Sequence, residues 1–164
     1  NPTRVFGPGL LSDSNSVTKL ISMFIRGKFR FLPGNGKSIG NYVFIDDVVK
    51  GLVLALEKGK SGERYILGGG NASYRTFFQK IRKVSGKTYS CFPFPLFLML
   101  FVSNIMALSA RWFKTEPLIT PGWVKKYNYD WKTSSEKAKK QLGYSITPLE
   151  TGIRKTIEWL QREK

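Results

Sequence analysis

Both a strand period and a helix period of apolar residues occur within 32–58, LPGNGKSIGNYVFIDDVVKGLVLALEK. A glycine-rich loop opens the stretch, and the β-branched and aromatic residues of 41–45 then predict a strand. Helical spacing follows, with five apolar residues on one predicted inward face: Val48, Val49, Leu52, Val53 and Leu56. We expect Asp47 to be the N-cap of this helix, because a carboxylate accepts the free N–H groups of a first turn.

The rest of the chain predicts short elements of both kinds. Strands are predicted at 29–32, 62–67 and 89–92, and Gly68 to Gly70 form the turn that leaves the second of them. Helices are predicted at 17–25, at 95–112 and between Ser73, as a cap, and Gly86. Three more follow: a short one opened by Thr120-Pro121, one ending at Gly143 and one starting at the capping box Thr147-Pro148-Leu149-Glu150. Without a repeat or a linker, 1–164 is interpreted as a single domain.

Positive charge is the main compositional feature of these 164 residues. Lys and Arg number 27 against 11 Asp and Glu, which gives a net charge of +16. Such a charge favours polyanionic partners such as nucleic acid, anionic lipid or phosphate-bearing cofactors. The cations are scattered along the chain instead of forming one arm, however, which favours a solvated surface over a nucleic-acid partner.

The chain contains one cysteine, Cys91, and no histidine. A single thiol excludes an internal disulfide and suits a reducing compartment, so the cytoplasm is the expected location. Histidine-based triads and zinc sites are excluded as well, and no metal site is predicted.

Glycine clusters invite a search for phosphate-binding loops. Gly36-Lys37-Ser38 has the form of the end of a P-loop, but Phe31 stands where such a loop needs glycine, and a predicted strand follows it. The spacing of the glycines at 34, 36 and 40 departs from the dinucleotide-binding fingerprint by one residue. The sequence therefore lacks a motif that cradles a nucleotide cofactor.

Four segments, in order, carry a resemblance: NPTRVFGPG, NYVFIDDVVKGLVLALEKG, GERYILGGGNAS and KAKKQLGYSITPLETGIRKTIEWL. Together they resemble the extended short-chain dehydrogenase/reductase family, also called the NAD-dependent epimerase/dehydratase superfamily. The resemblance implies an α/β fold: the C-terminal, substrate-binding part of a Rossmann-type enzyme, mostly helical with a few short strands. It also implies NAD or NADP in a longer parent enzyme. The abrupt start at Asn1 fits this expectation, with the dinucleotide-binding Rossmann half upstream.

The catalytic pair of this family is a Tyr followed four residues later by a Lys. None of the seven tyrosines has this partner; Tyr129, the nearest, has Lys132 at three residues and Thr133 at four. We therefore assign no catalytic residue, and we expect the chain alone to be inactive and to bind no dinucleotide tightly.

Within the family, the chain most resembles the dihydroflavonol-4-reductase and 3β-hydroxysteroid dehydrogenase types, which implies an oxidoreductase acting on a carbonyl or alcohol carbon of a small molecule. Nucleotide-sugar epimerases and dehydratases are the alternative. Gly40 stands where those enzymes commonly carry a diphosphate-binding arginine, and Arg4 is placed to compensate for it. A stand-alone basic module that binds membrane surfaces or nucleic acid is a rival from another class.

The resemblance also assigns residues to a site. It places Pro2 and Thr3 beside the nicotinamide of the cofactor, and it places four residues near the substrate: Arg4, Phe6, Asn41 and Tyr42. A purely local interpretation remains open, in which Pro2 shapes a turn while Phe6 and Tyr42 fill the core.

Residues 88–110 carry no formal charge and are rich in Phe and Leu. Pro93 and Pro95 leave about 15 residues for a helix, roughly 22 Å, against a hydrocarbon core of ~30 Å, so a spanning helix is not expected. A substrate-pocket lid or core helix is the first interpretation, and an interfacial anchor with peripheral membrane contact is the second. Open strand edges at 1–6 and 64–67 also predict a homo-oligomer.

Overall fold

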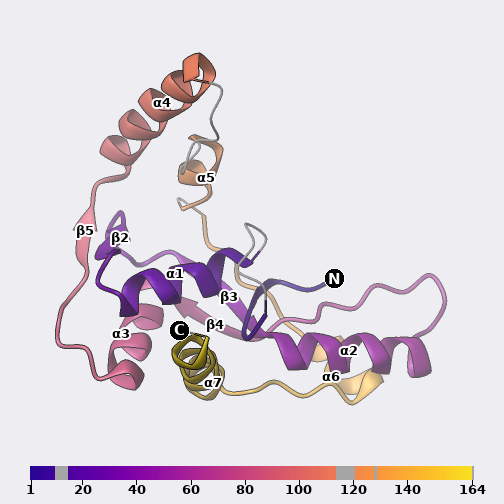
Figure 1. Ribbon diagram of the computed structural model, residues 1–164. Coiled ribbons are helices and arrows are strands. Elements are labelled where there is room, and N and C mark those ends of the chain that lie inside the picture. The colour runs from indigo at the N-terminus through magenta and orange to yellow at the C-terminus, as the bar shows by residue number, and fades with distance from the viewer. Residues whose placement is uncertain (10–14, 114–120, 128, 164) are drawn as a thin grey trace.

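A computed structural model describes residues 1–9, 15–113, 121–127 and 129–163. The described chain forms a body of short strands and helices from which one helical arm projects (Figure 1). The described elements are mostly helices with a few short strands, as expected from the sequence for this α/β fold.

The sheet of the body consists of β1 (Arg4–Phe6), β3 (Ile39–Phe44) and β4 (Gly70–Ser73), in the order β1-β3-β4. Strand β1 runs parallel to β3, and the register sets Arg4 opposite Tyr42. Strand β4 runs antiparallel to β3 on its other side. The predicted strand at 41–45 is thus confirmed, and its pairing brings two of the predicted site residues side by side.

The strand predicted at 62–67 is wrong. Only Leu67 of this segment pairs, in an isolated bridge to Pro2, and β4 begins at Gly70, inside the predicted turn. Tyr65 and Leu67 are buried against Leu142 instead of forming a ladder. Their alternating pattern therefore reflects side-chain packing of an extended segment and not strand pairing.

The main core lies between the sheet and three helices, α1 (Ser16–Ile25), α3 (Tyr74–Ser85) and α7 (Leu149–Arg162). Its aromatic centre is Phe6, whose ring meets Phe44 and Phe77 edge-on. Gly152 lets α7 approach closely, because a Cβ there would lie 2.9 Å from the Phe6 ring. Burial of each such ring contributes about 1.5–3 kcal/mol.

A second, smaller core joins α2 (Ile45–Lys58) to α6 (Glu136–Leu142). The predicted inward face of α2 is wrong for four of its five residues. Val48 is buried, but large apolar side chains stay exposed at Val49, Leu52, Val53 and Leu56. The side of α2 that packs inward instead carries the small residue Gly51, where a Cβ would lie 2.8 Å from Leu67 and 3.0 Å from Tyr144.

Some of the predicted helix caps are found in the structure and others are not. Ser73 caps α3 by accepting a hydrogen bond from the Thr76 amide, and Gly86 and Gly143 end α3 and α6, all as predicted. The predicted N-caps of α2 and α7 are wrong. Phe44, not Asp47, is the N-cap of α2, and Pro148, not Thr147, is that of α7, without a side-chain capping bond in either case.

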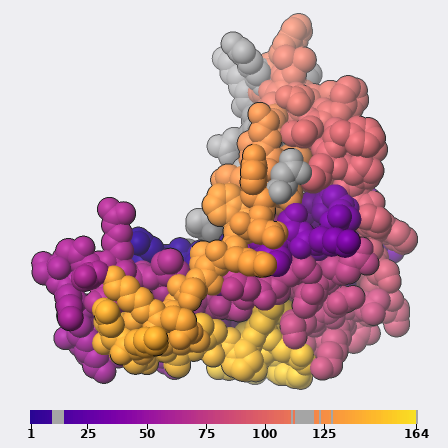
Figure 2. Space-filling view, turned by 180° about the vertical axis from the view of Figure 1, so that it is seen from behind, coloured from indigo at the N-terminus to yellow at the C-terminus, as the bar shows by residue number. Residues whose placement is uncertain are grey.

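The arm starts at the two-stranded sheet of β2 (Phe31–Pro33) and β5 (Phe92–Phe94), which run parallel. Helix α4 (Leu96–Phe113) follows, close to the predicted range, and packs against α5 (Pro121–Lys126). Seen from behind, the pair rises from the body (Figure 2). Among the residues described, none of the helices combines the length and the apolar character needed to cross a bilayer.

Candidate functional site

A cavity of about 320 Å³ opens at β1, beside α1 and the end of α5. Its polar lining includes Arg4, Tyr42, Tyr74 and Tyr127, which come from four separate stretches of the chain. Its other lining residues are Thr3, Val5, Ser16, Val17, Leu20 and Lys126. Such a volume lies in the range of small-molecule sites, which combine apolar walls with a few polar groups.

Arg4 is the cation at the centre of this cavity. Its Nη1 donates a hydrogen bond to the Tyr74 hydroxyl, and its guanidinium lies 5.4 Å from the Tyr74 ring centre and 5.9 Å from that of Tyr42. The Tyr127 ring meets Tyr74 edge-on at 5.3 Å. Burial lowers the pKa of Arg4, but interactions with Tyr74 outweigh it and raise that pKa overall. The guanidinium therefore stays charged and is held in place by aromatic rings.

The tyrosines around Arg4 keep their protons at neutral pH. Burial raises the pKa of Tyr127 to about 12 and raises that of Tyr74 as well. Burial also raises the pKa of Tyr42, which the neighbouring Arg4 charge opposes only in part. Protonated phenols donate hydrogen bonds, so the cavity presents donors to any ligand oxygen that enters it.

The Tyr42 hydroxyl is buried and lacks a hydrogen-bond partner within the described residues. A buried polar group without a partner costs about 1–3 kcal/mol, and such groups are rare in folded proteins. Tyr42 lines the cavity, but its hydroxyl oxygen is closed to solvent and lies beside the Arg4 guanidinium. The structural sign that the cavity suits a ligand is therefore the charged Arg4 in its wall.

Gly40 accommodates the arginine. A Cβ at Gly40 would stand 2.9 Å from Arg4 Nη1 and 3.0 Å from the Tyr42 hydroxyl. The space that a side chain at 40 would fill is thus taken by the guanidinium from β1.

Three of the six predicted site residues, Thr3, Arg4 and Tyr42, line the cavity together. Asn41 lies just behind it: its Oδ1 accepts from the Thr3 hydroxyl at 2.7 Å and from the Gly69 amide at 2.8 Å. Its Nδ2 donates to the Gly69 carbonyl and to Asn71, so Asn41 is a buried strut.

Phe6 and Pro2 do not line the cavity. Phe6 is 1% exposed and belongs to the aromatic core, as the local interpretation had it. Pro2 is exposed and pairs through its backbone with Leu67. Sequence reasoning missed Tyr74, Lys126 and Tyr127, because these reach β1 only through the packing of α3 and α5 and carry no local signal.

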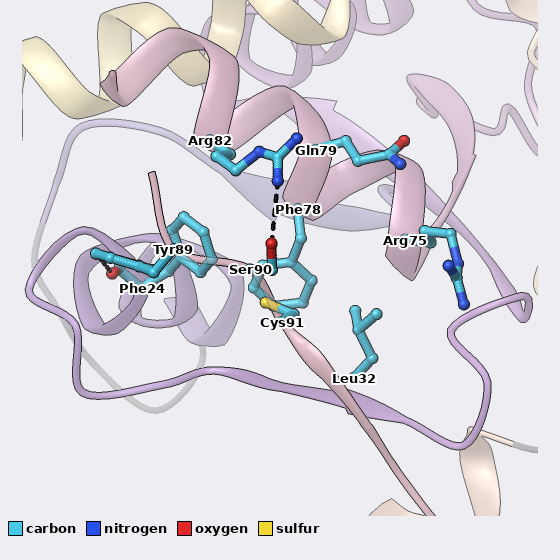
Figure 3. Close-up of a pocket in the computed structure, with 9 residues that line it drawn as sticks. All are labelled: Phe24, Leu32, Arg75, Phe78, Gln79, Arg82, Tyr89, Ser90 and Cys91. Atoms are coloured by element: carbon cyan, nitrogen blue, oxygen red, sulfur yellow. Dashed lines mark hydrogen bonds between the residues drawn. The ribbon is translucent and has the colours of Figure 1, made fainter. Parts of the chain in front are cut away.

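Two other cavities are weaker candidates. One of about 150 Å³ lies between α3 and β5 and includes Arg82 and Cys91 (Figure 3). Its cations are engaged, since Arg82 donates to Ser90 at 3.2 Å and Arg75 to the Asn35 carbonyl at 2.9 Å. Burial raises the pKa of the Cys91 thiol to about 11, which makes it a poor nucleophile. The other cavity, about 610 Å³, opens widely at the base of α4.

Comparison with known proteins gives matches to one family model and to several relatives. Residues 1–68 match the NAD dependent epimerase/dehydratase family. The chain is 27% identical over 172 residues to human short-chain dehydrogenase/reductase family 42E member 1, covering 98% of this chain and 42% of that protein. It is also 27% identical over 172 residues to 3beta-hydroxysteroid-dehydrogenase/decarboxylase isoform 1 of Arabidopsis thaliana, covering 96% of this chain and 38% of that protein.

Among solved structures, that of gox2253 superposes with a TM-score of 0.73 and 29% identity, covering 99% of this chain and 48% of that one. The chain therefore spans less than half the length of each of these three proteins. Together these matches support the NAD-dependent epimerase/dehydratase superfamily, which is the class of extended short-chain dehydrogenases/reductases, for this chain.

Proposed function

We propose that this chain provides the substrate-binding side of an NAD-dependent oxidoreductase that acts on a carbonyl or alcohol carbon. The observation that carries the proposal is the Arg4 cavity, in which a charged guanidinium lies among tyrosine side chains. The relatives support the class of reaction, since one of them is named as a 3β-hydroxysteroid dehydrogenase. The nucleotide-binding half and the catalytic Tyr and Lys would lie in another part of a protein as long as those relatives.

The chemistry of the cavity suits the binding of an oxygen atom attached to an apolar skeleton. Arg4 can donate to that oxygen, and Val5, Val17 and Leu20 provide an apolar wall. A charged donor in a partly buried site binds more strongly than a neutral one. These groups would hold the substrate in one orientation, with its reacting carbon near β1.

NAD would meet this chain at the start of β1, where the family resemblance places Pro2 and Thr3. Bound NAD supplies the hydride acceptor of such a reaction. Thr3 fits this position, because it lies at the cavity beside Arg4 and its hydroxyl is oriented by Asn41. Pro2 fits less directly, since its backbone is paired with Leu67. We therefore expect Thr3 to be the chief contact from this chain.

Among substrates we favour an apolar alcohol or ketone of the steroid or dihydroflavonol type. The cavity places Val5, Val17 and Leu20 close to its donors, and such a wall suits a ring system better than a sugar diphosphate. A nucleotide-sugar epimerase or dehydratase is the second candidate. Arg4 and Lys126 line the same cavity and are the two cations that a diphosphate would use.

A titration distinguishes these candidates. The isotope-labelled chain is titrated with a soluble 3β-hydroxysteroid and, separately, with UDP-glucose, and backbone amide resonances are followed by NMR. We expect the steroid to shift the amides of Thr3, Arg4 and Tyr74, and an Arg4→Met variant to weaken these shifts. Shifts at the same residues with UDP-glucose alone would favour the epimerase candidate. Shifts confined to the Cys91 cavity would contradict both.

A further inference from the structure

We propose that α4 lies in the surface of an anionic lipid bilayer, with its apolar face in the acyl region. The inference does not depend on the oxidoreductase proposal. It starts from a set of large apolar side chains that α4 leaves exposed to solvent: Phe97, Leu98, Phe101, Val102, Ile105, Leu108 and Trp112. Trp112 is 81% exposed and Phe97 69%, which is unusual for so many large apolar residues on one helix of a folded domain.

These seven residues share one face of the helix. At about 100° per residue they fall within an arc of about 140°, and Leu98, Phe101, Ile105, Leu108 and Trp112 follow each other at intervals of three and four. Among the described side chains of α4, the buried ones are the small Ser103 and Ala110, and Met99, Leu100 and Met106 are half-buried. Helix α4 thus packs through its other side and turns these seven large apolar residues outward.

Three uncharged polar side chains of α4, those of Ser103, Asn104 and Ser109, each donate a hydrogen bond within the helix. Asn104 Nδ2 donates to the Leu100 carbonyl at 2.7 Å, and Ser109 Oγ donates to the Met106 carbonyl at 3.0 Å. Ser103 also bonds to the Leu100 carbonyl, at 2.9 Å. In lipid, where water cannot serve as a partner, each unsatisfied polar group would cost several kcal/mol. The face can therefore enter an apolar phase without leaving these groups unpaired.

Charge complementarity points to anionic lipid as the occupant of this face. The chain carries +16, and Lys125 and Lys126 are exposed at the end of α5, which packs against α4. Anionic headgroups attract such cations by about 1 kcal/mol each near the surface. The arm stands away from the body, so a flat surface can reach it (Figures 1 and 2).

Flotation with lipid vesicles tests the proposal. The chain is mixed with vesicles of phosphatidylcholine alone or with a fraction of phosphatidylserine, and the bound protein is recovered after centrifugation in a density gradient. We expect binding to the vesicles with phosphatidylserine, weakened by added salt as the charges are screened. An arm variant, Phe101→Ser with Ile105→Ser and Leu108→Ser, should lose at least about tenfold in affinity, because three apolar anchors are removed.

The matched control is an α2 variant, Val49→Ser with Leu52→Ser and Leu56→Ser, which removes three exposed apolar side chains far from the arm. It should bind vesicles like the unmodified chain. Circular dichroism checks that both variants are folded. Failure of the unmodified chain to float, or equal flotation of the arm variant, would overturn the proposal. An arm variant that changes the mass of the chain in solution but not its vesicle binding would assign α4 to self-association instead, and would overturn it too.

Discussion

Arg4 Nη1 lies 2.9 Å from the point where a Cβ on Gly40 would stand. The two residues lie on neighbouring strands, β1 and β3, whose register also sets Arg4 opposite Tyr42. The guanidinium thus occupies the space left by the missing side chain at Gly40, and it donates a hydrogen bond to the Tyr74 hydroxyl. The position of the cation in the cavity depends on this glycine.

Gly40→Ala should displace the guanidinium and weaken its bond to Tyr74. We expect a loss of about 1–3 kcal/mol in the free energy of unfolding, the usual value for a hydrogen bond that involves a charged group. Urea denaturation measures this loss. Gly70→Ala is the matched control, since a Cβ there meets only Leu149 at an ordinary 3.8 Å. Equal stability of the two variants would show that Arg4 is not constrained by Gly40.

Asp47 should stabilise the chain through the start of α7 and not through its own helix. Its two carboxylate oxygens accept hydrogen bonds from the amide and the hydroxyl of Thr147, each at 2.7 Å. Asp47→Ala should therefore lower the free energy of unfolding by about 2–4 kcal/mol, because two charge-assisted bonds are lost together. The exposed neighbour Asp46 provides the comparison, and Asp46→Ala should change stability by less than about 0.5 kcal/mol. A similar loss for both variants in urea denaturation would contradict this role.

Cys91 should react slowly with a maleimide at neutral pH. Burial raises the pKa of its thiol to about 11, and only the thiolate is a strong nucleophile. The labelling rate should therefore rise with pH and level off only as the pH approaches that value. The chain unfolded in urea, whose thiol is free of burial, should label faster at every lower pH. Equal rates for folded and unfolded chain at neutral pH would refute the prediction.

The exposed face of α2 and the free edge of β1 should lead the chain to self-associate. Val49, Leu52 and Leu56 present apolar surface, and β1 is an edge strand of its sheet. Light scattering at tens of micromolar should therefore give a mass above that of one 18.7 kDa chain. The α2 triple-serine variant described above should reduce that mass. A monomer for the unmodified chain would show that these surfaces do not pair.

Local pattern was a good guide to where helices lie and a poor guide to which side they bury. The apolar periods at 17–25, 74–85 and 95–112 each correspond to a helix, since backbone propensity and spacing are properties of the segment itself. The apolar face of α2 was equally clear, yet it lies outward, because burial depends on what else is present to cover it.

The candidate site shows the same limit. Thr3, Arg4 and Tyr42 could be predicted because the family resemblance assigns them to a site. The pairing of β1 with β3 then brings them to one cavity. Tyr74 and Tyr127 were not, since they are 53 residues apart and meet only through the packing of α3 against the end of α5. The strand predicted at 62–67 failed for a related reason, because alternation alone does not distinguish a paired strand from an extended segment that packs on a helix.

The central claim is that the Arg4 cavity orients the substrate of an NAD-dependent oxidoreductase. The most direct measurement joins the chain to the nucleotide-binding half of the Arabidopsis relative and follows NADH formation from a 3β-hydroxysteroid. We predict turnover by the fusion, none by the chain alone, and a loss of about tenfold or more with Arg4→Met at unchanged NAD affinity, because one charged hydrogen bond to the substrate is removed. A fusion that binds NAD and turns over equally well with Arg4→Met, or turnover by the chain alone, would contradict the account.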